Sequence, residues 1–166
     1  MRTIVLIAHN LRSVHNVGSL LRTAEGIGVT KVYLTGYTPY PLEKNDKRLP
    51  HLSAKLNSQI SKTALGAEKT IDWEHFDSVL PVIKELLSAG FTVAALEQAT
   101  NSITLADFRP PDKLALIVGR EVEGIEPEVI QQASVVLEIP MFGQKESFNV
   151  VQAAAMALYR LRFLAE

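Results

Sequence analysis

The sequence predicts a single α/β domain of three layers, in which helices cover both faces of a mostly parallel sheet. Short apolar, β-branched runs alternate along the chain with longer segments of helical periodicity, which is the order typical of this fold class. Several of the runs are apolar throughout rather than at every second position, as expected of strands buried on both faces. A chain of 166 residues that is 47% hydrophobic suits one domain, so residues 1–166 are expected to form one unit.

Five runs are predicted as strands, and a sixth is weaker. The five are Thr3–His9, Lys31–Thr35, Phe91–Leu96, Leu114–Val118 and Val135–Ile139, and the weaker one is Lys69–Trp73. The expected helices are Val17–Ile27, Leu52–Leu65, Ser78–Ser88, Pro127–Gln132 and Asn149–Leu164. Gly90 stands where a glycine commonly ends a helix, and Pro127 stands where a helix can begin. The last helix is rich in small residues, which fit core packing and a subunit interface equally well.

The composition excludes or disfavours several kinds of site. The chain has no cysteine, which excludes disulfides and cysteine-based zinc sites. Its four histidines lack the spacing of metal ligands, so no metal is expected. The apolar run from Met1 to His9 is too short for a signal peptide or a membrane span. We therefore expect a cytoplasmic protein without a membrane partner.

The net charge of −1 disfavours a general nucleic-acid binder, which usually carries a basic bias. One stretch, from Lys44 to Lys69, is nevertheless basic, and it overlaps a long loop candidate from Gly36 to Pro50. A loop of this length in a compact domain is often functional. The basic cluster is either a solvated face or a local contact surface for RNA. Its members are Lys44, Lys47, Arg48, His51, Lys55, Lys62 and Lys69.

Three polar segments follow predicted strands, and ligands of open α/β sheets bind beyond the carboxyl ends of the strands. The first segment, Asn10–Ala24, places Asn16 at a natural capping position near the start of a helix. Gly18 permits close approach by a backbone or a ligand. Arg22 follows Gly18 by about one turn, so it lies on the same face and can grip a phosphate. An ion pair between Arg22 and Glu25 is the alternative.

The second segment, Gly119–Ile125, carries two glycines five residues apart, which indicates a tight loop whose amides can hold a small polar ligand. It lacks the fingerprints of phosphate loops and dinucleotide sites. Glu121 within it is either a site residue or a surface carboxylate.

The third segment, Pro140–Asn149, leads directly into the last helix, and either Ser147 or Asn149 suits the N-cap. Capping alone would explain both of these residues.

Together and in this order, the three segments resemble the motifs of the SpoU/TrmH methyltransferases, a branch of the SPOUT superfamily. The first resembles N-x-R-x(3)-N-x-G-x(3)-R-x-A, the second G-x-E-x-x-G, and the third I-P-M-x-G followed by S-L-N-V. Phe148 replaces the leucine of the last pattern, and Val151 and Gln152 replace small residues, which bears on the shape of the cofactor pocket. The matching residues are Asn10, Arg12, Asn16, Gly18, Arg22 and Ala24, then Gly119, Glu121 and Gly124, then Ile139–Gly143, Ser147, Asn149 and Val150.

The resemblance covers nearly the whole chain and implies a fold that periodicity does not. Members of the family have a deep trefoil knot near the C-terminus, and they form homodimers in which the first motif of one subunit completes the site of the other. They use S-adenosylmethionine, without a metal, to methylate ribose 2′-hydroxyl groups of RNA. We expect the same cofactor, a homodimer and an RNA substrate here. A tRNA is favoured over rRNA, because the chain resembles the minimal members, several of which act on tRNA.

The resemblance also implies residue roles. The expected catalytic residues are Arg22, which positions the substrate through a phosphate, Asn16, which orients the substrate or Arg22, Glu121, which organises the site, and Asn149, which holds the third segment. A free arginine is a poor base because its pKa exceeds ~12, so positioning is the safer role for Arg22. The segment Gly36–Lys69 is the expected RNA contact. The expected cofactor contacts are Leu96, Gly119, Ile139, Met141, Ser147 and Phe148.

Three alternatives accompany this interpretation. An rRNA 2′-O-methyltransferase would use the same chemistry, and the sequence does not separate the two RNA classes. A non-catalytic RNA-binding or assembly factor on the same fold is less favoured, because Arg22, Asn16 and Glu121 are all present. A generic nucleotide-binding α/β domain is disfavoured by the lack of a phosphate-loop motif.

Overall fold

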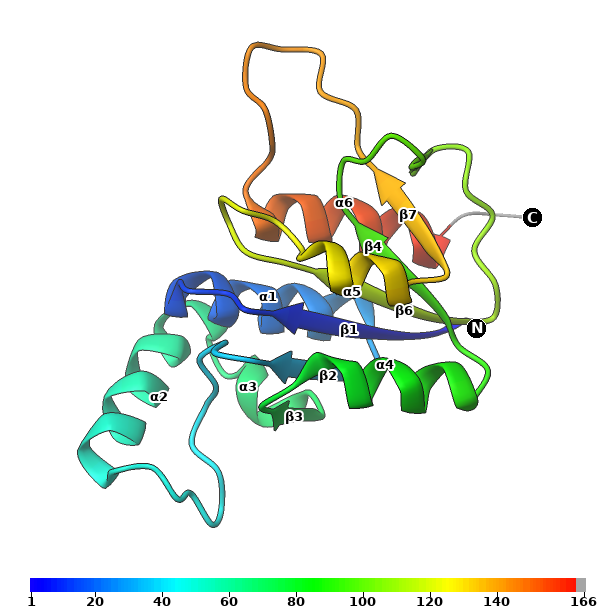
Figure 1. The fold of residues 1–166 in the computed structure, drawn as a ribbon. Helices are drawn as coiled ribbons and strands as arrows, with labels where there is room; N and C mark the ends of the chain where they lie inside the picture. Colours follow the sequence, from blue (N-terminus) through cyan, green and yellow to red (C-terminus); the bar gives the residue numbers. More distant parts are fainter. Residues whose placement is uncertain (164–166) are drawn as a thin grey trace.

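Seven strands and six helices alternate along residues 1–163, the part of the chain that the computed structural model describes (Figure 1). The strands are β1 (Thr3–His9), β2 (Lys31–Thr35), β3 (Trp73–Phe76), β4 (Thr92–Leu96), β5 (Ile103–Thr104), β6 (Lys113–Val118) and β7 (Val135–Glu138). The helices are α1 (Val14–Ile27), α2 (Pro50–Ala64), α3 (Ala67–Thr70), α4 (Val79–Ser88), α5 (Pro127–Gln132) and α6 (Val150–Phe163). No helix within these residues is long and apolar enough to cross a membrane.

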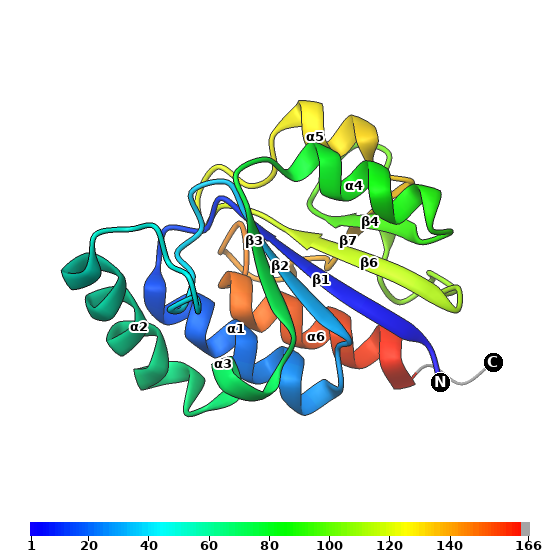
Figure 2. The same ribbon diagram turned by 90° about the horizontal axis from the view of Figure 1, so that it is seen from below.

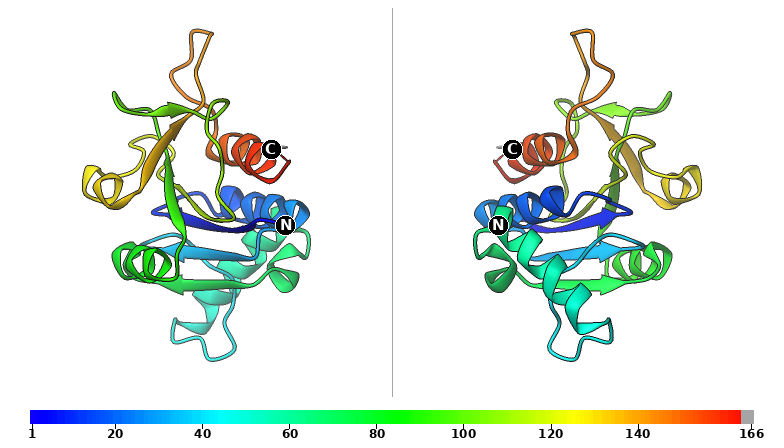
Figure 3. Two further views of the ribbon diagram at one scale, coloured as in Figure 1. Left: turned by 90° about the vertical axis from the view of Figure 1, so that its right-hand side faces the viewer. Right: turned by 90° about the vertical axis from the view of Figure 1, so that its left-hand side faces the viewer.

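The strands form one sheet in the order β3-β2-β1-β6-β4-β7-β5, and every pair in it is parallel. Helices α1, α2, α3 and α6 lie on one face of the sheet, and α4 and α5 lie on the other (Figure 2). The end views show the same two helical layers on either side of the strands (Figure 3). The predicted three-layer α/β architecture is therefore confirmed. The trefoil knot implied by the family resemblance stays a prediction.

The two central strands, β1 and β6, supply both hydrophobic cores. Leu6 and Leu116 are aligned in the register and belong to the core beneath α1 and α6. Their neighbours Ile7 and Ile117 point to the opposite face and belong to the core beneath α4 and α5. All four side chains are fully buried. The continuously apolar runs in the sequence thus arise from strands with a helical layer on each face.

Helix α1 begins at Val14, three residues earlier than predicted, because Ser13 and not Asn16 is its N-cap. The Ser13 hydroxyl accepts a hydrogen bond from the backbone N–H of Asn16 at 3.2 Å. The Asn16 side chain is therefore not needed for capping. The helix ends at Gly28, whose φ of 75° is the left-handed conformation that glycine adopts without strain.

The predicted strand Lys69–Trp73 is wrong, because residues 67–70 form the short helix α3 and strand β3 begins only at Trp73. Glu68 fixes this turn. One of its carboxylate oxygens accepts the N–H of Gly66 at 3.0 Å, and the other accepts the hydroxyl of Ser61 at 2.8 Å. These local bonds favour a helical turn over an extended strand. The two-residue strand β5 was also not predicted. Apart from the start of α1, the other predicted elements agree within one or two residues at the ends that the structure describes.

Gly18 permits the close crossing of α1 over α2. A β-carbon placed at this position would lie 2.1 Å from Thr63 Oγ1 and 2.3 Å from the backbone oxygen of Ile60. Thr63 also donates a hydrogen bond of 2.9 Å to the carbonyl of His15, which joins the two helices at the same point. The glycine of the first motif is thus explained by a neighbouring backbone rather than by a ligand.

Helix α6 packs beside α1 and carries different residues on its two faces. Ala154 and Ala157 are fully buried in the core, so these small residues serve internal packing. Arg162 donates to the backbone oxygens of Ile27 and Gly28, which joins the end of α6 to the end of α1. The predicted last residue of the helix, Leu164, lies outside the described residues.

Candidate functional site

The sheet order brings the second and third motif segments together. Strand β4 lies between β6 and β7, so the loops that follow these three parallel strands leave the sheet at one edge. The loop after β6 spans 119–126, and the loop after β7 spans 139–149 and extends away from the sheet (Figure 1). A cavity of about 260 Å³ lies between them. This is the carboxyl-terminal edge at which open parallel sheets bind ligands.

Five of the six residues expected to contact the cofactor line this cavity. The exception is Met141, which is half-buried and lies outside the lining. Phe148, one of the departures from the family pattern, is 38% exposed and forms part of the wall. Gln152, another departure, is exposed and does not line the cavity. The five residues are Leu96, Gly119, Ile139, Ser147 and Phe148.

The glycines of the second motif are required by the packing of their own loop. A β-carbon at Gly119 would lie 2.6 Å from Ile125 Cγ1 and 2.9 Å from the backbone of Gly124. Arg120 and Gly124 form a small antiparallel bridge, and the Arg120 side chain donates to the Gly124 carbonyl at 3.0 Å. The loop is therefore a closed turn whose two ends are in contact. Such a turn holds its backbone amides in fixed positions before any ligand arrives.

Glu121 joins the second motif loop to the first. Its carboxylate accepts the backbone N–H groups of Arg12 at 3.2 Å and Ser13 at 3.1 Å, and the side-chain amide of Asn16 at 3.1 Å. Burial raises the pKa of Glu121, but these hydrogen bonds, together with its own backbone N–H, outweigh burial and bring the pKa below its usual value. Glu121 is therefore a charged acceptor that organises the start of α1, and not a free surface carboxylate.

Asn149 brings the third motif segment to the same point. Its side-chain nitrogen lies 3.4 Å from the side-chain oxygen of Asn16, which is a long hydrogen bond. Its own side-chain oxygen accepts the N–H of Val151 at 2.9 Å, so Asn149 also caps the start of α6. Three of the four expected catalytic residues are thus linked beside the cavity, because Asn16 contacts both Glu121 and Asn149.

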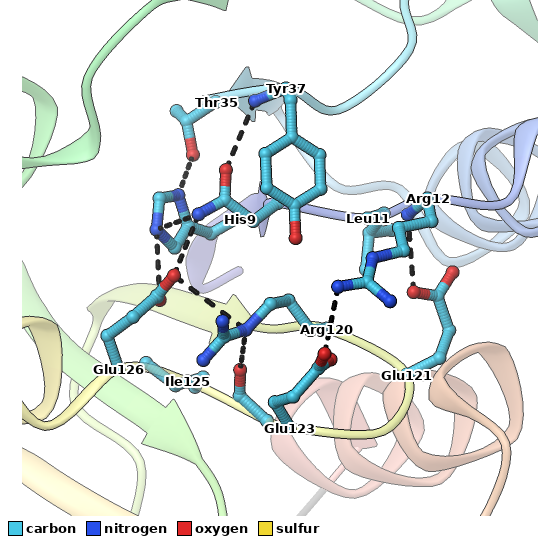
Figure 4. Close-up of polar contacts among 12 residues, drawn as sticks. His9, Leu11, Arg12, Thr35, Tyr37, Arg120, Glu121, Glu123, Ile125 and Glu126 are labelled. Atoms are coloured by element: carbon cyan, nitrogen blue, oxygen red, sulfur yellow. Dashed lines mark hydrogen bonds and ion pairs between the residues drawn. The ribbon is translucent and has the colours of Figure 1, made fainter.

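A hydrogen-bond network around the buried side chains of His9 and Thr35 holds the first loop at the end of β1 (Figure 4). Asn10 has a φ of 55°, and its side chain donates to Glu126 at 2.8 Å and accepts the N–H of Tyr37 at 3.1 Å. Glu126 lies 3.2 Å from His9, whose other ring nitrogen is 2.9 Å from the Thr35 hydroxyl. Burial lowers the pKa of His9, and the neighbouring Glu126 opposes this shift. The motif residue Asn10 therefore connects three loops through its side chain.

Arg22 lies apart from the other three expected catalytic residues. It follows Asn16 by six residues, which rotates it by about 120° around the helix axis. It is exposed in a shallow groove between α1 and α2 that is also lined by Ser19, Thr23 and Thr63. Within residues 1–163 no ion pair joins Arg22 to Glu25. Arg22 therefore does not line the cavity of the same chain. The alternative, an ion pair with Glu25, is not formed within the described residues either.

The basic cluster of 44–69 divides into one structural residue and several exposed ones. Arg48 donates to Asp46 and to the carbonyls of Tyr40 and Pro41, and its guanidinium lies 3.6 Å from the centre of the Tyr40 ring. It therefore holds the loop together. The exposed members are Lys44, Lys47, His51, Lys55, Lys62 and Lys69.

The SpoU rRNA Methylase family matches residues 3–159, and this range is nearly the whole chain. The chain belongs to this family. A tRNA (guanosine(18)-2′-O)-methyltransferase of Aquifex aeolicus is 27% identical over 158 residues, which cover 95% of this chain and 68% of that protein. A 23S rRNA (guanosine-2′-O-)-methyltransferase RlmB of Neisseria meningitidis is 30% identical over 96% of this chain. The alignment spans only 58% of the Neisseria protein.

Solved structures of the SpoU type confirm the fold. The A. aeolicus TrmH/SpoU tRNA modifying enzyme superposes with a TM-score of 0.79 over 98% of this chain and 75% of its own, at 23% identity. An AdoMet-bound rRNA methyltransferase of Sinorhizobium meliloti gives a TM-score of 0.80 at 20% identity, with 98% of this chain and 57% of that chain covered. A third structure, from work on the 2-OH methylation of C/U34 on tRNA, superposes with a TM-score of 0.78 at 22% identity. The superposition covers 96% of this chain and 94% of that chain.

Two lining residues that directly follow Leu96 were not predicted from the sequence. Glu97 and Gln98 both line the cavity, and each contacts one of the two loops that enclose it. They belong to none of the three motif segments. Their position at the carboxyl end of a buried strand was the available signal, since the two motif loops lie at the ends of the neighbouring strands.

Proposed function

We propose that this protein is an S-adenosylmethionine-dependent RNA methyltransferase that modifies a ribose 2′-hydroxyl group, with tRNA as its substrate. The observation that carries the proposal is that Asn16 contacts both Glu121 and Asn149 at the edge of the cavity. These residues come from the three motif segments of the SpoU family. Relatives named as tRNA and rRNA 2′-O-methyltransferases support the reaction class.

The residues around the cavity fit the proposed cofactor. The half-buried Leu96 and Ile139 offer apolar surface to an adenine ring, and the loop from Gly119 presents backbone amides and carbonyls. Ser147 and Phe148 close the side formed by the third motif. When bound, S-adenosylmethionine supplies an electrophilic methyl group, whose carbon–sulfur bond breaks as the ribose oxygen bonds to carbon and its proton departs to solvent.

The protein's own residues have two tasks in such a reaction, to align the ribose oxygen and to fix the groups around it. Glu121 holds the backbone of Arg12 and Ser13 and the Asn16 amide, so Asn16 has little rotational freedom. Asn16 also retains a side-chain oxygen that faces Asn149. The pair presents amide groups of fixed orientation to the ribose, which suits positioning rather than proton abstraction.

Arg22 acts, in this proposal, in the site of the partner subunit. The Arg22 side chain points away from Glu121 of its own subunit, so a second copy is needed to bring Arg22 to the cavity. The outer face of α6 supports such an assembly, because Met156, Tyr159 and Phe163 are 38%, 63% and 62% exposed. The Tyr159 and Phe163 rings contact each other with centroids 4.9 Å apart. A homodimer that buries this face beside α1 would cover the apolar surface.

The exposed basic residues of α2 are proposed as the RNA contact. Lys55 and Lys62 are seven residues apart, so they lie on the same face of the helix, and His51 precedes Lys55 by one turn. Two or three phosphate contacts of this kind suffice for a salt-dependent gain in affinity. The choice of tRNA over rRNA rests on the resemblance to the minimal members of the family.

Transfer of labelled methyl groups to RNA tests the function directly. Purified protein is incubated with radiolabelled S-adenosylmethionine and either unmodified tRNA transcripts or rRNA fragments, and the modified nucleotide is located by its resistance to alkaline hydrolysis. We expect label at a single tRNA ribose. Label in rRNA alone would support the rRNA alternative. Cofactor binding without transfer to either RNA would favour the non-catalytic RNA-binding factor.

A further inference from the structure

Glu97 lies between the two loops, 119–126 and 139–149, that enclose the cavity. It directly follows β4, the strand that lies between β6 and β7 in the sheet. The residues after β4 therefore stand between the loop that follows β6 and the loop that follows β7. Glu97 and Gln98 both line the cavity at this point.

The two residues hold one loop each. The Glu97 carboxylate accepts the backbone N–H of Ile125 at 3.0 Å and that of Gln98 at 3.0 Å, one on each oxygen. The Gln98 side chain donates to the carbonyl of Glu146 in the third motif segment at 2.9 Å. The end of β4 thus connects the two walls of the cavity through side chains.

The Glu97 carboxylate also explains the second glycine of the second motif. A β-carbon at Gly124 would lie 2.1 Å from Glu97 Oε2, and Gly124 has a φ of 71°. The loop therefore closes directly against this carboxylate, and a side chain at Gly124 would displace it. The close approach of Gly124 and the two backbone hydrogen bonds fix the orientation of this carboxylate in the wall of the cavity.

We propose that Glu97 recognises the ribose of the bound cofactor, by accepting hydrogen bonds from its two hydroxyl groups. This inference rests on the proposed function, since it concerns how S-adenosylmethionine is held. A carboxylate accepts about four hydrogen bonds, and backbone amides occupy one position on each oxygen of Glu97. One acceptor position therefore remains on each oxygen, and the ribose of the cofactor carries two neighbouring O–H donors that could use them.

The location of the reaction also favours the ribose as the partner. Glu121, Asn16 and Asn149 mark the side of the cavity next to α1 and α6. Glu97 contacts Ile125, which belongs to the core beneath α4 and α5 on the opposite face of the sheet. The methyl group must lie near the first side, so Glu97 meets a part of the cofactor that is turned away from the reacting carbon.

Binding measurements with S-adenosylhomocysteine and its 2′-deoxy and 3′-deoxy counterparts test the inference without catalysis. We expect the wild-type protein to bind each deoxy compound about tenfold or more weakly, because a hydrogen bond to a charged group is removed. We expect Glu97→Gln to bind S-adenosylhomocysteine about tenfold more weakly and to distinguish the deoxy compounds by less than about threefold. Glu85→Gln, at an exposed position on α4, is the matched control and should behave as wild type.

The outcomes separate the inference from the proposed function. Wild-type protein that binds all three compounds alike would overturn the role of Glu97, whatever the variant does. The same holds if Glu97→Gln still distinguishes the deoxy compounds as wild type does. A variant that binds 5′-methylthioadenosine normally, although it binds S-adenosylhomocysteine weakly, would assign Glu97 to the amino-acid end and also overturn the inference. Absence of binding to any compound by wild type would overturn the proposed function itself.

Discussion

The side-chain amide of Asn16 donates a hydrogen bond of 3.1 Å to the carboxylate of Glu121, across 105 residues of sequence. Asn16 belongs to the first helix and Glu121 to the loop after β6, and β1 and β6 are adjacent strands. The contact is therefore a consequence of the sheet order, which places the ends of these two strands side by side. It makes Glu121 the residue on which the geometry of the first motif depends.

Replacement of Glu121 by glutamine should lower stability in a pH-dependent way. Burial raises the pKa of Glu121, but hydrogen bonds from Ser13, Glu121 and Arg12 backbone groups and from Asn16 outweigh it and bring the pKa below the ordinary 4.5. Such a carboxylate stabilises the folded state above its unfolded pKa, and the contribution is lost as the pH falls through the folded pKa. The stability difference between wild type and Glu121→Gln should be constant above about pH 5.5 and should shrink below 4.5.

Thermal unfolding of both proteins between pH 7 and pH 3 provides this measurement, with Glu128→Gln, an exposed position on α5, as the control. At neutral pH we expect Glu121→Gln to melt about 2–4 °C below wild type, for a loss of about 1 kcal/mol. A difference that grows on acidification would show that Glu121 is not stabilised in its charged form.

Gly18→Ala should destabilise the protein, although alanine is the better helix former. The new methyl group would meet Thr63 Oγ1 and the backbone oxygen of Ile60, so α1 and α2 would have to separate. We expect a loss of about 1–3 kcal/mol in the free energy of unfolding, as in other overpacked sites. Gly26→Ala on the same helix is the matched control, because nothing lies within 4 Å of its β-carbon position. It should be neutral or stabilising by up to about 1 kcal/mol in urea denaturation; equal effects of the two substitutions would refute the packing argument.

Tyr159→Glu should convert the proposed homodimer into monomers. The substitution puts a charge into the middle of the exposed apolar face formed by Met156, Tyr159 and Phe163 on α6. Burying an unpaired carboxylate in an interface is strongly unfavourable. Light scattering at micromolar concentration measures the mass of both proteins. Leu87→Glu, which changes a 40% exposed leucine on α4, should leave the mass unchanged. A wild-type protein that is already monomeric would contradict both the dimer and the role of this face.

Local patterns in the sequence predict the sheet and the three polar segments, whereas the resemblance to the SpoU/TrmH family implied the five expected cofactor contacts that line the cavity. Apolar runs mark the buried strands, and glycines mark the loops. The sequence did not predict that Ser13, and not Asn16, is the N-cap of α1. Both residue types are good N-caps, and only the path of the backbone decides between them. Glu97 was not predicted either, because its contact with Ile125 depends on the order of strands in the sheet and not on spacing. The separation of Arg22 from Glu121 likewise follows from helix rotation, which motif matching ignores.

Reversal of charge at Lys55 and Lys62 should weaken RNA binding without affecting the cofactor. Both residues are exposed on one face of α2, away from the cavity. Removal of each phosphate-binding lysine should make the slope of the logarithm of the RNA association constant against the logarithm of the salt concentration shallower by about 0.7–0.9. Filter binding of tRNA at several salt concentrations measures this slope for wild type and for the double variant that carries both Lys55→Glu and Lys62→Glu. Lys84→Glu with Arg109→Glu makes the same change in net charge at other exposed positions. Equal losses in the two double variants would mean that only the overall charge matters.

Arg22→Ala should abolish methyl transfer while S-adenosylhomocysteine affinity stays within about twofold of wild type. Arg22 is exposed on α1, outside the cavity lined by Gly119 and Ser147, so its loss leaves the cofactor contacts intact. Loss of a positioned guanidinium commonly costs ~10²-fold or more in rate. Arg22→Lys should recover little, because an ammonium group lacks the planar fork that grips a phosphate.

Single-turnover transfer to tRNA and calorimetric titration of the cofactor product separate the roles of Arg22, with Arg109→Ala as an exposed control. The proposed dimer adds a sharper test. Mixing Arg22→Ala with Asn149→Ala should restore activity to a fraction of the heterodimers, because in these one site would have an intact Asn149 and also Arg22 of the partner subunit. Recovery is expected only if Arg22 acts across the interface. If both residues act within one subunit, every site in the mixture is defective, and the absence of recovery would place Arg22 in its own subunit's site.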